Sequence, residues 1–170
     1  MPASRHGLAF DPIAEARRLW CEHGWADTAN GMAAVTSVMR VEQILLARVD
    51  QSLAPFGLTF ARYEVLALLD FSSSGSLPLG KVGSRLQVHP TSVTNAVDRL
   101  EAQGFVRRVP HPSDGRATLA ELTAEGRRTV HRATKALNAE VFGRVGLDED
   151  ELVMLFGLLE KLRRSAGDFS

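Results

Sequence analysis

A short run of polar residues near the middle of the chain carries side chains that can hydrogen-bond to nucleic-acid bases and phosphates. Asn95 can form two hydrogen bonds with adenine, and Arg99 can form two with guanine. Thr91 and Ser92 have hydroxyl groups that suit phosphate oxygens, as do the free N–H groups at a helix start. Pro90 directly before them favours the first position of a helix. These residue types in this order indicate a helix that contacts duplex DNA.

The helix that would carry these residues has two faces. At about 100° per residue, Thr91, Asn95 and Asp98 lie opposite an apolar side, with Ser92 and Arg99 on a flank. The apolar side consists of Val93, Ala96, Val97 and Leu100. A recognition helix needs small polar groups outward, because its first turns approach base edges closely. An ordinary amphipathic surface helix has the same pattern, so this helix alone leaves both interpretations open.

Further arginines lie in an expected β-hairpin. Asp114 and Gly115 predict its turn. The strands span residues 105–109 and 117–122. An arginine at the tip, Arg116, can enter a narrow and electronegative minor groove, and Asp114 would orient it, since a carboxylate near phosphate is repelled. Arg107 and Arg108 are neighbours on a strand, so only one can face DNA, and we take Arg107 as the candidate.

Capping residues and apolar spacing predict the elements that hold these groups. Helices are expected at 12–23, 27–53, 59–71, 81–86, 90–103, 123–141 and from 148 onward, with an extended step at 77–79. A helix, a short helix, a three-residue turn, a helix and a hairpin form a winged helix-turn-helix. The expected fold is therefore mainly α with a small β-hairpin wing.

Three regions follow from this order. Residues 58–122 form the expected winged helix-turn-helix domain, residues 31–57 and 123–170 a helical dimerisation region, and residues 1–30 an N-terminal extension with a short helix. The apolar residues of the 27–53 helix cover more than one stripe, so that helix must be covered on most sides. In a chain this small, a second copy is the expected cover.

Composition and charge limit the classes of protein. The 170 residues have 45% apolar content and no net charge, which fits one globular domain, or one domain with an added oligomerisation arm, and the length excludes a (β/α)8 barrel. Residues 78–132 carry a net charge of +4, whereas the segments before and after each carry −2. A basic middle between acidic flanks is typical of a nucleic-acid-binding surface.

Other classes are not indicated. No apolar run reaches the roughly 18 residues that span a bilayer, and the single cysteine, Cys21, fits a reducing cytoplasm. The five histidines lack metal-ligand spacing, so no metal or cofactor is expected. The phosphate-loop, nucleophile-elbow, zinc-protease and dinucleotide-binding motifs are missing from the sequence, so we do not expect an enzyme.

Three stretches resemble the MarR family of bacterial transcription regulators: LTFARYEVLALL at 58–69, VTNAVDRLEAQGFVRR at 93–108, and PHPSDGRATLAELTAEGR at 110–127. The last is the most specific, and the resemblance covers about residues 30–165. It implies a cytoplasmic homodimer whose two lobes grip a pseudo-palindromic duplex operator, usually as a repressor. It also implies DNA contacts by Ser92, Thr94, Asn95, Arg99 and, in the wing, Arg116.

Departures from the family pattern limit this transfer. Asn95 stands where many relatives have a basic residue, so base preference does not carry over. His89 stands in an N-cap position usually held by Ser, which caps better. Gln87 stands where a turn Gly is common, so strain is expected there.

Two hypotheses concern the signal that controls DNA binding, and a third concerns a different function of the chain. The resemblance suggests a small aromatic or phenolic acid as effector, and Trp20, Trp25, Arg40 and Arg62 are candidates for its site. Cys21 is an alternative, a redox sensor assisted by Arg17 and Arg18 one turn earlier. A third possibility is a winged-helix module that docks protein, although such a module does not need three arginines on its hairpin.

Overall fold

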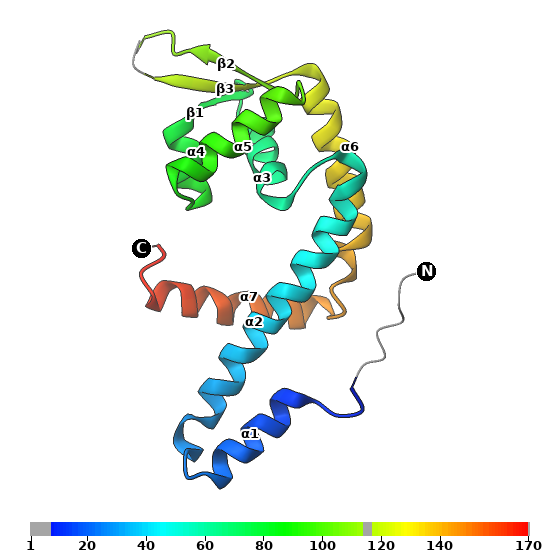
Figure 1. The fold of residues 1–170 in the computed structure, drawn as a ribbon, viewed down its shortest axis with the longest axis vertical. Helices are drawn as coiled ribbons and strands as arrows, with labels where there is room; N and C mark the ends of the chain where they lie inside the picture. Colours follow the sequence, from blue (N-terminus) through cyan, green and yellow to red (C-terminus); the bar gives the residue numbers. More distant parts are fainter. Residues whose placement is uncertain (1–7, 114–116, 170) are drawn as a thin grey trace. The chain divides into compact units, whose positions relative to one another are not determined.

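The structure is a computed structural model that describes residues 8–113 and 117–169 (Figure 1). The chain divides into two compact units, Met1–Val49 and Asp50–Ser170. Helix α2 continues from the first unit to Leu53. The expected boundary at residue 30 therefore lies inside a helix.

The first unit is a pair of helices, α1 (Pro12–Glu22) and most of α2 (Ala26–Leu53). The Asp11 carboxylate accepts a hydrogen bond from the Ile13 N–H at 2.9 Å, which confirms the predicted start of α1. The sequence predicts Asp27 as the cap of α2, but this is wrong by position, because α2 begins at Ala26, one residue before the expected start, and Asp27 lies in its first turn. There its negative charge interacts favourably with the positive end of the helix dipole.

The second unit contains the remaining helices and the sheet. Its helices are α3 (Phe60–Phe71), α4 (Leu79–Leu86), α5 (Pro90–Ala102), α6 (Ala124–Glu140) and α7 (Glu149–Ser165), with short 3-10 turns at Ala54–Phe56 and Phe142–Arg144. Thr123 caps α6 and Asp148 caps α7, in agreement with the expected helix starts at 123 and 148, and Asp148 also forms a capping box with Glu151. Helix α4 begins at Leu79, two residues before the expected start, because Pro78 supplies the fixed φ that precedes it.

Three antiparallel strands lie in the order β1-β3-β2. The wing strands are β2 (Val106–Pro110) and β3 (Thr118–Leu122), and Arg108 lies opposite Ala120. The third strand, β1 (Ser76–Pro78), pairs with β3 through Leu77 and Ala120, where the sequence indicated only an extended step. A strand of three residues has too little alternation to be recognised before its partner is known.

The core of the second unit lies between α3, α5, α6 and the sheet. Leu66, Val97, Leu100, Ala120 and Leu137 are fully buried there. Both α3 and α4 pack against α5, so the helix that carries the candidate polar residues is supported from behind (Figure 1). No helix in the described part of the chain is long and apolar enough to cross a bilayer.

Candidate nucleic-acid interface

Helix α5 presents the two faces that its sequence predicts. Val93, Val97 and Leu100 are buried, and the five candidate contact residues are all exposed. These five are Thr91, Ser92, Thr94, Asn95 and Arg99. The Thr94 hydroxyl donates a hydrogen bond within the helix, to the Pro90 carbonyl at 3.1 Å. The outer face of α5 is therefore available for a partner molecule.

The turn before α5 is shaped by two unusual residues. The His89 Nδ1 accepts a hydrogen bond from the Thr91 N–H at 3.2 Å, so histidine does act as the N-cap. Gln87 has φ 54° and ψ 39°, the left-handed conformation that favours glycine. It is the one non-glycine residue with positive φ in the described ranges, so the expectation of strain at this position is confirmed.

The two neighbouring arginines of the wing have different surroundings. The Arg107 side chain is 65% exposed, and its Nη2 lies 2.6 Å from Glu121 Oε1 on the adjacent strand. The Arg108 side chain is 26% exposed and is bound by Asp98 and Glu101 of α5. Strand alternation thus leaves Arg107 as the outward member of the pair, in agreement with its choice as the candidate.

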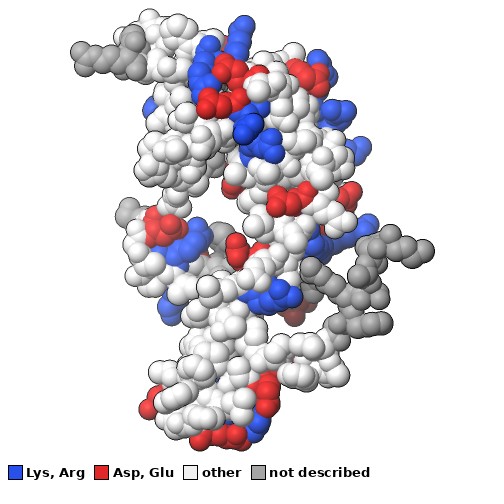
Figure 2. Space-filling view, viewed as in Figure 1, with Lys and Arg blue, Asp and Glu red and all other residues white. Residues whose placement is uncertain are grey.

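The contacts of Arg108 also shift the pKa values of Glu101 and of Arg108 itself. Hydrogen bonds from the Arg108 backbone N–H and then from its guanidinium hold the pKa of Glu101 below its usual value. Partial burial acts to lower the pKa of Arg108, but the hydrogen bonds to Asp98 and Glu101 outweigh it and raise that pKa. Glu101 and Arg108 are therefore both charged at neutral pH. Figure 2 shows Lys and Arg atoms next to Asp and Glu atoms around the sheet and α5.

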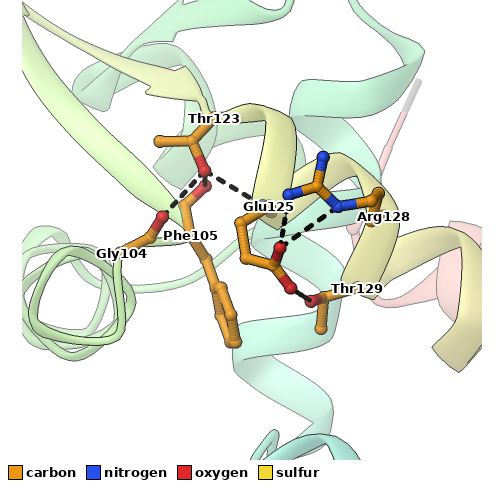
Figure 3. Close-up of polar contacts among 7 residues, drawn as sticks. Gly104, Phe105, Thr123, Glu125, Arg128 and Thr129 are labelled. Atoms are coloured by element: carbon orange, nitrogen blue, oxygen red, sulfur yellow. Dashed lines mark hydrogen bonds and ion pairs between the residues drawn. The ribbon is translucent and has the colours of Figure 1, made fainter.

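Hydrogen bonds of Thr123 hold the start of β2 and the end of β3 together at the base of the wing, and we call this contact with Gly126 the Thr123 joint (Figure 3). The Thr123 hydroxyl donates to the Gly104 carbonyl at 2.7 Å and accepts from the Gly126 N–H at 3.0 Å. The Thr123 N–H donates to the Phe105 carbonyl at 3.0 Å. Gly104 and Phe105 lead from α5 into β2, and Thr123 leads from β3 into α6. Helix α5, the wing and α6 are thus tied together.

The first turn of α6 is reinforced beside this joint. The Glu125 carboxylate accepts from Arg128 at 2.6 Å, and this bond lowers the pKa of Glu125. Sequence reasoning predicted Thr123 as the cap of this helix but missed the bonds from Thr123 to Gly104 and Phe105 and the close approach of Gly126 to the Phe105 carbonyl. Their signal in the sequence was a capping Thr with Gly three residues later.

Asp114 and Arg116, the expected tip of the wing, lie outside the described residues. Their roles stay predictions from the sequence.

The candidate effector residues are distributed over both units. In the first unit, the rings of Trp20 and Trp25 lie edge to face, with centroids 4.9 Å apart, and Arg40 donates to the Gln43 amide oxygen at 3.2 Å. In the second unit, Arg62 donates to Thr59 at 3.2 Å and to Gln103 at 3.3 Å. A depression of about 510 Å³ on α6 is lined by other residues: Glu125, Arg128, His131 and Arg132. An effector site at the four candidates stays a prediction.

Cys21 is exposed in the last turn of α1. The arginines expected to activate its thiol have other partners: Arg17 donates to the Asn30 amide oxygen at 2.7 Å, and Arg18 pairs with Glu15 and Glu22. Redox sensing through Cys21 stays an untested alternative. In the described part of the chain, no three His, Cys, Asp or Glu side chains gather as a metal site requires.

The fold and this surface define a winged helix-turn-helix protein. Residues 58–118 match the MarR family profile. A solved relative, Sco5413, a MarR family transcriptional regulator from Streptomyces coelicolor, is 53% identical, with a TM-score of 0.75 over 83% of this chain and 98% of that one. Sco3205 from the same organism, solved in complex with DNA, is 26% identical, with a TM-score of 0.72 over 81% of this chain and 88% of that one.

A curated relative supports the same assignment. The HTH-type transcriptional regulator PrsX of Escherichia coli is 30% identical over 117 residues, which are 67% of this chain and 70% of PrsX. The chain therefore belongs to the MarR family of transcriptional regulators, as the sequence resemblance indicated.

Proposed function

We propose that this chain works as a homodimer that binds a pseudo-palindromic DNA operator and represses transcription until a small aromatic or phenolic acid releases it. The observation that carries the DNA-binding part is the exposed polar face of α5 beside an arginine-bearing wing. Asn95 and Arg99 contact bases, and Thr91, Ser92 and Thr94 contact phosphates or base edges. Arg107, on the wing, contacts the phosphate backbone of the DNA.

The homodimer is supported by large apolar side chains that are exposed on α7 and on α2. On α7, Val153, Met154, Phe156 and Leu158 are each between 62% and 67% exposed. On α2, Val35 and Met39 are exposed to a similar degree. Faces of this kind on long helices are buried in protein interfaces rather than left in water. Two subunits would place their recognition helices about 34–36 Å apart, in successive major grooves.

Release follows from the same geometry. A ligand that binds the DNA-incompetent spacing of the recognition helices more tightly shifts the population away from DNA. The ligand class comes from family resemblance, and Trp20, Trp25, Arg40 and Arg62 are its candidate contacts. Aromatic acids that raise the melting temperature and also lower DNA affinity would support this part. Acids that leave both unchanged would contradict it.

The DNA-binding part is tested by selecting bound duplexes from a random pool and measuring affinity against salt. We expect affinity to fall steeply as salt rises, because several counterions are released per dimer. Asn95→Ala should weaken binding to the selected duplex by about 1–3 kcal/mol and leave random duplex nearly unaffected. A flat salt response of the wild-type chain, or an equal loss on both duplexes, would contradict the proposed readout.

A further inference from the structure

Arg108 joins the wing to the recognition helix through three contacts. Its Nη2 lies 2.5 Å from Asp98 Oδ1, its Nη1 donates to Glu101 Oε2, and its backbone N–H donates to Glu101 Oε1 at 2.9 Å. A guanidinium can bind two carboxylates at once because its N–H groups form a rigid planar fork. The β2 strand and α5 are therefore held together by side chains as well as by the turn between them.

The same contacts control charge on the DNA-facing side. Asp98 lies on the outer side of α5 with Asn95, and 54% of its side chain is exposed. Two free carboxylates at this position would repel DNA phosphates. The Arg108 cation lies between them and reduces the net charge of the cluster from −2 to −1. Nη1 and Nη2 of Arg108 each bind a carboxylate, and only 26% of the side chain is exposed, so Arg108 has less capacity to bind phosphate than Arg107 has.

The direction of the wing depends on the same cluster. The hairpin leaves α5 through a short turn in which the Phe105 N–H donates to the Leu100 carbonyl at 2.9 Å. The Thr123 joint fixes the base of the hairpin, and Arg108 adds a tie two residues into β2. A small rotation about the base would displace the far end of the hairpin relative to α5. Specific binding needs both elements to meet DNA together.

We propose that Arg108 is a positioning residue for DNA binding, which fixes the wing against α5 and neutralises Asp98 and Glu101 without contacting DNA. This inference rests on the proposed function, in which α5 and the wing bind duplex DNA. Charge and position are separable, because binding to random duplex depends mainly on charge and binding to a selected operator also depends on orientation.

Three variants separate the two effects. Arg108→Lys keeps the charge but cannot hold both carboxylates in the same geometry, so operator affinity should fall about 10-fold while random-duplex affinity stays within about 2-fold. Arg108→Met should weaken binding to both duplexes. Adding Asp98→Asn and Glu101→Gln to Arg108→Met should restore random-duplex affinity and only part of the operator affinity.

Arg107→Met is the matched control, since it makes the same change at the next residue of β2. It should weaken both duplexes equally and lower the salt dependence by about one counterion. Neutralising Asp98 and Glu101 should not rescue it. Thermal melting of every variant reports folding, and Arg108→Lys keeps the test decisive if Arg108→Met unfolds.

The outcomes are distinguishable. If the wild-type chain shows no salt-dependent duplex binding, the proposed function and this inference both fail. If the wild type binds and Arg108→Lys binds operator equally well, only the positioning role fails. If the triple variant binds random duplex no better than Arg108→Met, the neutralising role fails.

Discussion

Replacing Gly126 by alanine sets two physical effects against each other. Gly126 lies in the first turn of α6, and alanine is the better helix former by up to about 1 kcal/mol. Propensity alone therefore predicts a more stable protein. The packing predicts the opposite, because a Cβ at this position would lie 2.0 Å from the Phe105 carbonyl oxygen and 2.9 Å from Leu122 Cδ1.

The size of the effect follows from what must move. The obstructing atom belongs to the backbone, so α6 or the α5–β2 turn must shift, at an overpacking cost of about 1–3 kcal/mol. The Phe105 carbonyl also accepts from the Thr123 N–H at 3.0 Å and lies 3.1 Å from its hydroxyl. Weakening these contacts costs about 0.5–1.5 kcal/mol each. After a propensity gain of about 1 kcal/mol, Gly126→Ala should destabilise the protein by about 1–5 kcal/mol.

Thermal unfolding at a fixed protomer concentration measures this effect. A loss of that size corresponds to a melting temperature lower by roughly 2–20 °C in a chain of this length. Gly31→Ala is the matched control, since it also lies within a helix but has no atom within 4 Å of its Cβ position, and it should not destabilise. A melting temperature of Gly126→Ala equal to or above the wild type would refute the steric argument.

Three further predictions concern other sites. Gln87→Gly should raise the free energy of unfolding, measured by chemical denaturation, by about 0.5–1 kcal/mol, because glycine adopts φ 54° without strain. A decrease would mean that the hydrogen bond from the Gln87 amide to the Asp168 carbonyl, at 2.8 Å, stabilises the protein by more than the strain destabilises it. Because Arg108 lowers the pKa of Glu101, its contribution to stability is present above pH 4.5 and is lost as the pH falls through the lowered value. Glu101→Gln should therefore be less stable than wild type at pH 7 and should approach it in acid melts; a constant difference would contradict this assignment. Phe156→Glu should shift the protein toward monomer in sedimentation, because a charge cannot be buried unpaired at an apolar interface; an unchanged dimer would place the interface elsewhere.

The polar face of α5 could be predicted because it depends on local periodicity. Val93, Val97 and Leu100 recur at helical spacing, so their burial exposes Asn95 wherever the helix packs. The partners of the wing arginines could not be predicted this way. Alternation showed that Arg107 and Arg108 point to opposite sides, but which side faces α5 depends on how the hairpin folds back.

The Asp70 carboxylate illustrates the same limit. It accepts from Arg127 at 2.5 Å and contacts His131 Nε2 at 2.8 Å, so it ties α3 to α6 across 57 and 61 residues of sequence. Nothing in the spacing of these residues marks them as partners. The side chain of Asp70 is only 14% exposed. The sequence gives no sign of this burial, because a single Asp near the end of a helix is usually exposed.

The sequence by itself determined where helices begin and end to within about two residues, and which residues of α5 lie on each face, because caps, glycine turns and apolar spacing act within a few residues. It also indicated the family, through the stretch from Pro110 to Arg127. Tertiary structure alone decided that Gly126 must lack a side chain, that β1 completes the sheet, and that Arg108 binds the acids of α5. These contacts join segments that are distant along the chain, and only packing of the whole second unit brings them within bonding distance.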